Sequence, residues 1–210
     1  MITFSTRRRE AGISLVIVLV LLIAAVFLGV SAGVIALQSE KASRIDRDRQ
    51  VAFQAAEAAL TDAQRDIDGT GSSSSPNVRT ITFSQDSALA FPGDDESQLC
   101  GAITDGSAFG LCKLPLQSGR PTWLQVDLAD ASGTTHSVEY GHFTGQTFPV
   151  NKAALPAALP RYIIELIAFN QPGQSAQVGA QSFAYRITAI GFGADSKTRV
   201  VLQAFYRKES

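Results

Sequence analysis

One stretch near the N-terminus decides the fold: residues 11–39 read AGISLVIVLVLLIAAVFLGVSAGVIALQS and hold no ionisable side chain. Its apolar segment, residues 13–37, is 25 residues long and consists mostly of Val, Leu, Ile and Ala. A helix of that length measures roughly 37 Å at about 1.5 Å per residue, enough to cross a hydrocarbon core of about 30 Å. The apolar segment therefore predicts a membrane-spanning helix.

A short cationic leader precedes the apolar segment. Arg7, Arg8 and Arg9 are consecutive, and Gly12 stands directly before the apolar residues. Positive residues beside a membrane-spanning helix favour the cytoplasmic side. We therefore expect residues 1–12 in the cytoplasm and the chain after the helix on the far side of the membrane.

The remainder of the chain is long enough for one globular domain. Residues 38–210 follow the apolar segment and suffice for a hydrophobic core. The whole chain carries 18 basic and 19 acidic residues, and no stretch forms a basic stripe. Nucleic-acid binding needs such positive charge to neutralise phosphates, so the composition argues against nucleic acid as a partner.

The helix is expected to continue beyond the membrane into the domain. No Pro occurs before Pro76, and after Gly33 the next Gly is Gly69. Apolar residues then recur at steps of three and four, which is the period of an amphipathic helix. They are Phe53, Ala56, Leu60, Ala63 and Ile67. We therefore predict one helix over residues 13–67, in which residues 38–68 are an amphipathic continuation that ends at the glycine.

Beyond a Ser-rich loop at residues 70–76, strand patterns replace the helical period. The candidate strands are residues 80–83, 123–128, 137–148, 162–169, 183–190 and 198–206. The last two flank the favourable turn sequence GADS at residues 193–196 and form the clearest hairpin. The sequence thus predicts an α+β fold, with a long N-terminal helix packed on an antiparallel sheet in a β-rich domain of residues 69–210.

The chain has two cysteines, Cys100 and Cys112. If the domain is exported to an oxidising compartment, we expect them to pair. A bond that closes so short a loop contributes about 3 kcal/mol in the chain-entropy model. The alternative is two unpaired buried thiols.

Residues with catalytic or metal-binding potential are sparse. His136 and His142 are six apart and would share a face of one strand, but no third ligand for zinc accompanies them. Asp94, Asp95 and Glu96 are typical of a solvated loop, with a calcium site as the alternative. No G-x-S-x-G, Walker or C-x-x-C motif occurs. We expect no enzyme activity, no metal and no cofactor.

The leader and the apolar segment together resemble the class III signal of type IV prepilins. In that family a membrane peptidase cuts after the glycine and methylates the new N-terminus. The resemblance implies a leader peptide of residues 1–12, cleavage between Gly12 and Ile13, and N-methylation of Ile13. Cleavage there removes the cytoplasmic charges and leaves the apolar helix intact, free to leave the bilayer and pack against other helices in a filament.

A second resemblance covers residues 46–60, DRDRQVAFQAAEAAL, which are similar to the signature of PilX-type minor pilins. Its marked positions are Phe53, Ala56, Glu57 and Leu60. The C-terminal part is similar to the same family at residues 110–112, 185–189 and 200–203. The resemblance implies a minor pilin of a type IV pilus, with roles in pilus biogenesis, twitching motility and adhesion.

The same resemblance implies partners and a location. The partners are other minor pilins, the major pilin, the prepilin peptidase and the inner-membrane assembly platform. The chain would be a single-pass protein of the inner membrane with a periplasmic C-terminal domain. From there it would enter the pilus at the cell surface.

One position departs from the general pilin pattern. Ile17 stands at the fifth position of the processed chain, where most pilins carry Glu. That carboxylate is thought to meet the N-terminal amine of a neighbouring subunit. PilX-like subunits commonly lack it, so the departure favours a subunit at the tip or at the start of assembly over a shaft subunit.

Three other interpretations stay open. A minor tip pseudopilin of a type II secretion system also lacks the glutamate, but such subunits carry a large helical insertion for which residues 72–160 leave little room. A simple membrane-anchored periplasmic domain explains the apolar segment but neither Gly12 nor the signature at residues 46–60. An ordinary secretory signal cleaved after Ala32 leaves the apolar residues 34–37 unexplained.

Overall fold

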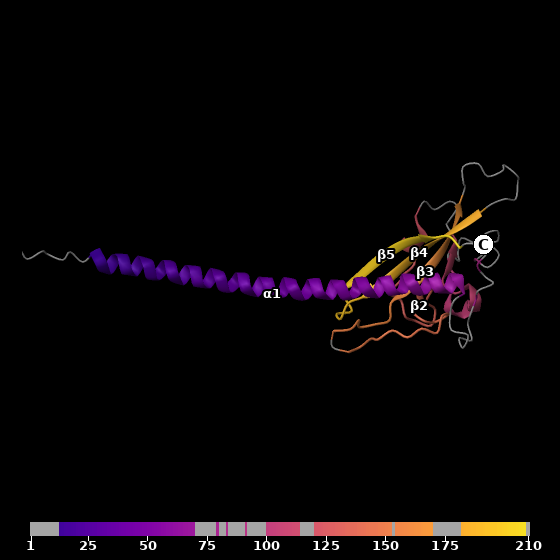
Figure 1. The fold of residues 1–210 in the computed structure, drawn as a ribbon, viewed down its shortest axis with the longest axis horizontal. Helices are drawn as coiled ribbons and strands as arrows, with labels where there is room; N and C mark the ends of the chain where they lie inside the picture. Colours follow the sequence, from indigo (N-terminus) through magenta and orange to yellow (C-terminus); the bar gives the residue numbers. More distant parts are fainter. Residues whose placement is uncertain are drawn as a thin grey trace, which may run out of the picture. The chain divides into compact units, whose positions relative to one another are not determined.

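The structure of the chain is a computed structural model that describes residues 13–69, 79, 83, 91, 100–113, 120–152, 154–169 and 182–208. The chain divides into two units, Met1–Asp46 and Arg47–Ser210. The first contains the apolar part of a long helix. The second contains the rest of that helix and a β-sheet (Figure 1).

The long helix α1 spans Ile13–Asp68 and is 56 residues long. It ends where the sequence predicts, because Gly69 has a φ of 71° and its N–H donates to the Asp66 carbonyl at 3.3 Å. A glycine in the left-handed region is a common helix stop since it has no Cβ to clash with the preceding turn. The predicted single helix is confirmed.

The sheet consists of β1 (Leu111–Lys113), β2 (Val138–Glu139), β3 (Arg161–Phe169), β4 (Ser182–Phe192) and β5 (Arg199–Tyr206). Its order is β1-β3-β4-β5, and β2 also pairs with β3. The pairs β2–β3, β3–β4 and β4–β5 are antiparallel, whereas β1 runs parallel to β3. The α+β architecture with a mostly antiparallel sheet is therefore confirmed.

The predicted hairpin and the strand before it are present. β4 and β5 pair without interruption from Tyr185 opposite Tyr206 to Phe192 opposite Arg199. Their connection is closed by the Gly193 N–H, which donates to the Thr198 carbonyl at 2.8 Å. β3 covers the predicted strand at residues 162–169.

Two predicted strands are wrong. Residues 122–124 form a short 3-10 helix, because the N–H of Gln125 donates to the Thr122 carbonyl and closes a turn after Pro121. Of residues 137–148, only Val138–Glu139 joins the sheet. Gly141 and Gly145 have positive φ angles there and turn the chain away. The candidate strand at residues 80–83 lies outside the described residues, apart from Phe83.

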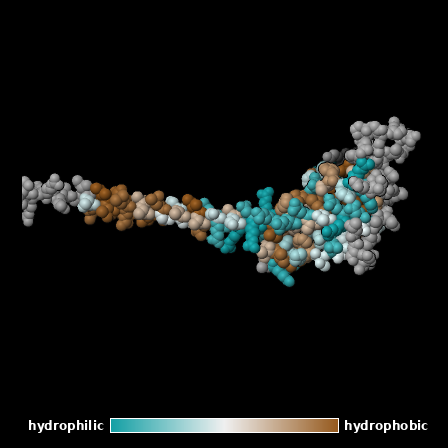
Figure 2. All heavy atoms as spheres, in the orientation of Figure 1, coloured by the Kyte–Doolittle hydropathy of each residue, from teal (hydrophilic) through white to brown (hydrophobic). Residues whose placement is uncertain are grey.

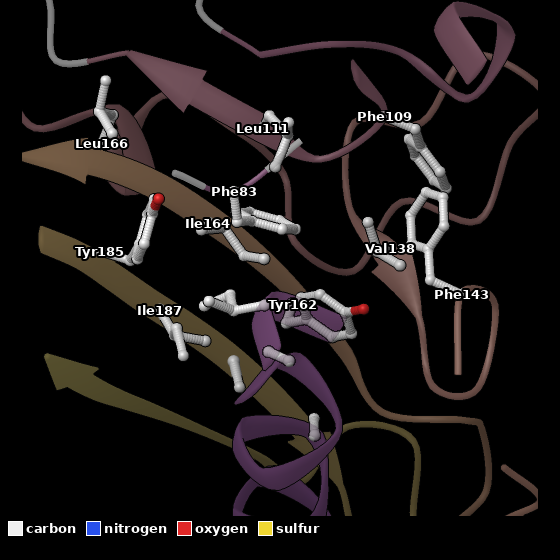
Figure 3. Packing of buried hydrophobic residues seen from close by; sticks show 14 of the residues in the cluster. Phe83, Phe109, Leu111, Val138, Phe143, Tyr162, Ile164, Leu166, Tyr185 and Ile187 are labelled. Carbon is white, nitrogen blue, oxygen red and sulfur yellow. The ribbon is translucent and has the colours of Figure 1, made fainter. Parts of the chain in front are cut away.

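The two faces of the sheet carry separate clusters of buried apolar residues. The face toward α1 combines helix alanines with aromatic and aliphatic side chains of β1, β2, β3 and β4, several of which Figure 3 shows. Its largest fully buried members are Ile67, Phe109, Leu111, Tyr162, Ile164, Tyr185 and Ile187. The opposite face is covered by Cys100, Cys112, Leu128, Ile163, Ile190 and Phe192. The sheet is thus the central layer of the domain.

Alanine residues form the side of α1 that faces the sheet. An ideal Cβ on Gly191 of β4 would lie 2.1 Å from the Ala52 carbonyl oxygen, so helix and sheet approach closely at this point. The buried residues of α1 are Ala52, Ala55, Ala56, Ala59, Asp62, Ala63, Asp66 and Ile67. Small side chains permit this close approach, and a larger side chain in the seam would force the layers apart.

The predicted apolar face of the helix requires one correction. Phe53 was expected to face the core, but 43% of it is exposed. Ala56, Ala63 and Ile67 are fully buried as predicted, but at the start of the stripe Ala52 rather than Phe53 faces the sheet. Leu60 is partly buried and packs against the edge of the core. The three-and-four period identifies the correct helix. Its largest apolar residue, Phe53, lies at the edge of the buried stripe.

Candidate assembly site

The apolar segment of α1 has no cover within the described chain. Every described side chain from residue 14 to residue 46 is exposed, and Figure 2 shows the apolar part as brown spheres. α1 is long and apolar enough to cross a membrane, and none of its most apolar window is buried. Apolar surface of this extent marks a lipid-facing or protein-facing segment, because its exposure to water is unfavourable.

The position at which most pilins carry a carboxylate lies within the described part of this segment. α1 is described from Ile13 onward, and the predicted cleavage residue Gly12 lies outside the described residues. Ile17 lies in the second turn of the helix and is 53% exposed. The segment therefore offers an apolar surface without a charge at this position.

The four marked positions of the signature divide into two pairs. Ala56 is fully buried against the sheet, and Leu60 packs on the edge of the core. Phe53 and Glu57 lie on the exposed side of α1. One pair thus holds the helix in the domain, and the other faces outward.

A buried ionic network joins α1 to the sheet near the end of the helix. Both oxygens of Asp66 accept from Nε of Arg79 at 3.1 Å, and one also accepts from Nη2 at 2.6 Å. The Tyr162 hydroxyl donates to the same carboxylate at 3.1 Å. Both charged side chains are only 1% exposed. Burial of two charges is tolerated because each is paired and hydrogen-bonded.

Arg79 also connects the network to neighbouring loops. Its Nη1 donates to the carbonyls of Ser107 and Phe109, and its guanidinium lies 3.6 Å from the ring centroid of Phe143. Burial, together with the negative charge of Asp66, raises the pKa of Tyr162 well above its usual value. The tyrosine therefore remains a hydrogen-bond donor at all physiological pH values.

A second buried carboxylate holds the turn that follows β2. Asp62 accepts from the Gly141 N–H at 2.8 Å and from the Thr144 hydroxyl. Burial raises the pKa of Asp62, and these two hydrogen bonds only partly oppose it. The sequence analysis missed both aspartates, although extending the period from Ala59 and Ala63 places Asp62 and Asp66 on the buried side.

At the other end of the domain, α1 holds the hairpin turn. Oδ1 of Asp48 accepts from the N–H groups of Ala194 and Asp195 at 2.5 and 3.2 Å. Partial burial raises the pKa of Asp48, but hydrogen bonds from Thr198, Asp195 and Ala194 outweigh it and hold the pKa below its usual value. An ideal Cβ on Gly193 would lie 2.6 Å from Oδ1, so a side chain there would displace the Asp48 carboxylate from the turn.

The two cysteines form the predicted disulfide. Cys100 and Cys112 are both buried and lie under the face of the sheet opposite α1. They close a narrow loop in which the Gly110 N–H donates to the Gly101 carbonyl at 3.0 Å. At its tip lies the 3-10 helix Ile103–Ala108, in which residues 103–107 are exposed to solvent.

The two histidines do not share a site. Nδ1 of His136 lies 2.9 Å from the Cys100 carbonyl, whereas the His142 ring packs edge-on against Phe109 and Phe143. Burial and the nearby charge of Arg79 lower the pKa of His142. Within the described part of the chain, no three His, Cys, Asp or Glu residues are grouped to hold a metal ion. The acidic residues 94–96 lie outside the described residues.

Two family models match the chain. The model described as Type IV pilus assembly protein PilX C-term matches residues 96–208, and the PilX N-terminal model matches residues 11–61. No curated protein and no solved structure matches. The N-terminal match covers the apolar segment and the signature, and the C-terminal match covers the disulfide and the sheet. The chain belongs to the PilX family of type IV pilus assembly proteins and is a minor pilin of that type.

Proposed function

We propose that this minor pilin initiates pilus assembly or occupies the pilus tip, and that it matures by cleavage between Gly12 and Ile13. The observation that carries the proposal is the uncovered apolar segment, which begins at Ile13 and has no charge at Ile17. Such a helix is suited to a bilayer first and to a bundle of helices later, because both environments cover it on all sides.

Cleavage after Gly12 makes this exchange of environments possible. The leader contains Arg7, Arg8 and Arg9, and these charges would have to cross the bilayer core if the helix left the membrane with them. A charged residue at the centre of a membrane helix costs about 2.5 to 3.5 kcal/mol on insertion scales. Removal of the leader and N-methylation of Ile13 leave a helix that can be extracted.

The missing carboxylate at position 17 supports a role at the start of the filament. In the pilin pattern, Glu at this position meets the N-terminal amine of a neighbouring subunit. Ile17 has no carboxylate and cannot make this contact. Insertion of this subunit beneath one already in the shaft is therefore not stabilised by such a contact. A first subunit does not require that contact.

Location and partners follow from the same proposal. The subunit rests in the inner membrane, with residues 38–210 in the periplasm, and then moves into the pilus. It meets the prepilin peptidase, the inner-membrane assembly platform, other minor pilins and the major pilin. The family is generally structural rather than enzymatic, and twitching motility and adhesion depend on the pili that it helps to start.

The proposal is tested by processing and by position in the filament. Gly12→Glu should block maturation and leave full-length chain in the membrane, while Ala11→Ser serves as a matched leader change that should mature normally. Cells with Gly12→Glu should assemble fewer pili. Immunogold labelling of the wild-type subunit should mark filament ends. Normal maturation of Gly12→Glu contradicts the processing claim, and labelling along the whole shaft contradicts the tip or initiator role.

A further inference from the structure

The edge of the sheet formed by β5 is open within the described chain. In the order β1-β3-β4-β5, the strand β5 pairs only with β4, and no described residue pairs with its other side (Figure 1). The opposite end of the sheet differs, because β3 is paired there with both β1 and β2. β5 is therefore the one long strand whose outer backbone groups have no described strand beside them.

The pairing of β4 and β5 shows which backbone groups point outward. The Gly193 N–H donates to the Thr198 carbonyl, so this pair is hydrogen-bonded. Hydrogen-bonded and non-hydrogen-bonded pairs alternate along an antiparallel ladder. The even positions of β5, from Val200 to Tyr206, consequently bond β4. The backbone N–H and C=O groups of Arg199, Val201, Gln203 and Phe205 point away from it.

Apart from Arg199 at its start, β5 lacks the features with which proteins protect an open edge. Its sequence, RVVLQAFY, contains no Pro, Gly or Lys, and its pairing with β4 has no bulge. Val201 is 45% exposed and Phe205 is 72% exposed, both on the face opposite α1. Natural edge strands are usually short, charged, bulged or covered, because a long apolar edge pairs with other chains.

We propose that β5 binds an extended strand of a different pilus subunit, which extends the sheet by one strand. This inference rests on the proposed function, which places the chain among other pilins. The outward backbone groups supply the hydrogen bonds of the added strand, and Val201 and Phe205 supply apolar contacts at alternate positions. The structure thus assigns β5 as a subunit contact in addition to α1.

Charge identifies the kind of strand. Arg199 is exposed at the start of β5, and no described carboxylate pairs with it. A second copy of β5 in antiparallel alignment must match odd positions with odd positions for its side chains to share a face. With Val201 opposite Val201 or Phe205 of the copy, Arg199 lies opposite Gln203 or Arg207, and neither residue is acidic. The occupant is therefore an apolar strand of another chain that carries Asp or Glu opposite Arg199.

A photo-crosslinking amino acid at position 201 tests the contact in the full chain. The probe is p-benzoylphenylalanine, introduced by Val201 replacement in piliated cells, with Thr104 replacement as the control on the exposed loop. We expect a light-dependent adduct from position 201 that mass spectrometry assigns to an extended segment of a different pilus subunit. The control should not give that adduct. An adduct between two copies of this chain, or no adduct at position 201, overturns the proposal.

A second set of variants tests the backbone and the charge. Gln203→Pro removes an outward N–H and leaves the ladder to β4 intact, while Gln203→Ala controls for the side-chain bond to Thr188. In the crosslinking chain, Gln203→Pro should lower the adduct at least tenfold and Gln203→Ala less than twofold. Arg199→Glu should lower it and Arg199→Lys should retain it, with steady-state protein levels unchanged.

An adduct that survives both Gln203→Pro and Arg199→Glu overturns strand addition. If Gln203→Pro lowers the protein level, the comparison of Arg199→Glu with Arg199→Lys alone tests the proposal. Failure here is distinguishable from failure of the proposed function. A chain that is cleaved after Gly12 and is needed for piliation, yet gives no adduct at position 201, contradicts only the role of β5.

Discussion

The two parts of α1 are one continuous helix with opposite relations to the rest of the chain. In residues 14–46 every side chain is exposed, whereas in residues 47–68 one side is buried against the sheet. The first part is apolar on all sides up to Leu37 and carries exposed charged residues from Glu40 onward. The second part has a buried seam of alanines with two paired aspartates, and polar residues outside. The difference shows that secondary structure alone does not decide the environment of a helix; the distribution of side chains around it does.

The largest effect is expected from breaking the buried ion pair in the second part. Arg79→Ala leaves Asp66 buried without its cation, so the free energy of unfolding should fall by about 3 to 5 kcal/mol. The exposed pair Arg44–Glu40 in the first part is the matched control, and Arg44→Ala should change stability by less than about 0.5 kcal/mol. Urea unfolding of both variants in detergent measures the difference. Equal effects would contradict the contrast between the two parts.

Loss of the disulfide should rank next. Cys100→Ser is expected to lower the free energy of unfolding by about 2 to 4 kcal/mol, because the bond restricts the unfolded chain. The wild-type protein unfolded with and without a reducing agent gives an independent estimate of the same quantity. If neither comparison changes the urea midpoint, the bond does not stabilise the domain.

Overpacking the alanine seam should have an intermediate effect. Ala59→Leu adds volume at a fully buried position facing the sheet, which should cost about 1 to 3 kcal/mol. Ala25→Leu makes the same change in the exposed apolar segment and should leave domain stability and membrane insertion unaltered. Thermal unfolding with membrane fractionation checks both. A destabilising Ala25→Leu would mean that the first part packs on its own chain.

The smallest effect is expected from the titration of Asp62. Burial raises its pKa above the ordinary 3.8, so the folded state holds this proton more tightly than the unfolded state. Asp62 therefore contributes a stability that is greatest at low pH and declines as pH rises from about 4 through the folded pKa. Asp62→Asn should remove that decline. Urea midpoints across this pH range test the prediction, and identical pH profiles for both proteins would contradict it.

The sequence predicts the elements whose periodicity is long and uninterrupted. The helix, β3, the β4–β5 hairpin and the disulfide were all foreseen, because each depends on a local pattern or on a count of cysteines. The orientation of Phe53 was not, because the alanine seam that decides it depends on the close approach of β4 at Gly191. The parallel pairing of β1 with β3 likewise depends on contacts remote in sequence.

The candidate site was predictable to a similar extent. The apolar segment follows directly from its composition, and the signature at residues 46–60 was found on the correct helix. The burial of Asp62 and Asp66 was missed because carboxylates are usually exposed, and their partners Thr144 and Arg79 are distant in the chain. The alternation of apolar and polar residues at 123–128 predicts a strand. The prediction is wrong because Pro121 starts a turn there.

The most direct test of the account is the intact mass and N-terminal sequence of the protein recovered from native membranes. The account predicts a chain that begins at N-methylated Ile13, with residues 1–12 removed and the apolar segment retained. A chain that begins at Met1 would make α1 a permanent anchor, and one that begins at Gly33 would make residues 1–32 a secretory signal. Either result would contradict maturation as a pilin.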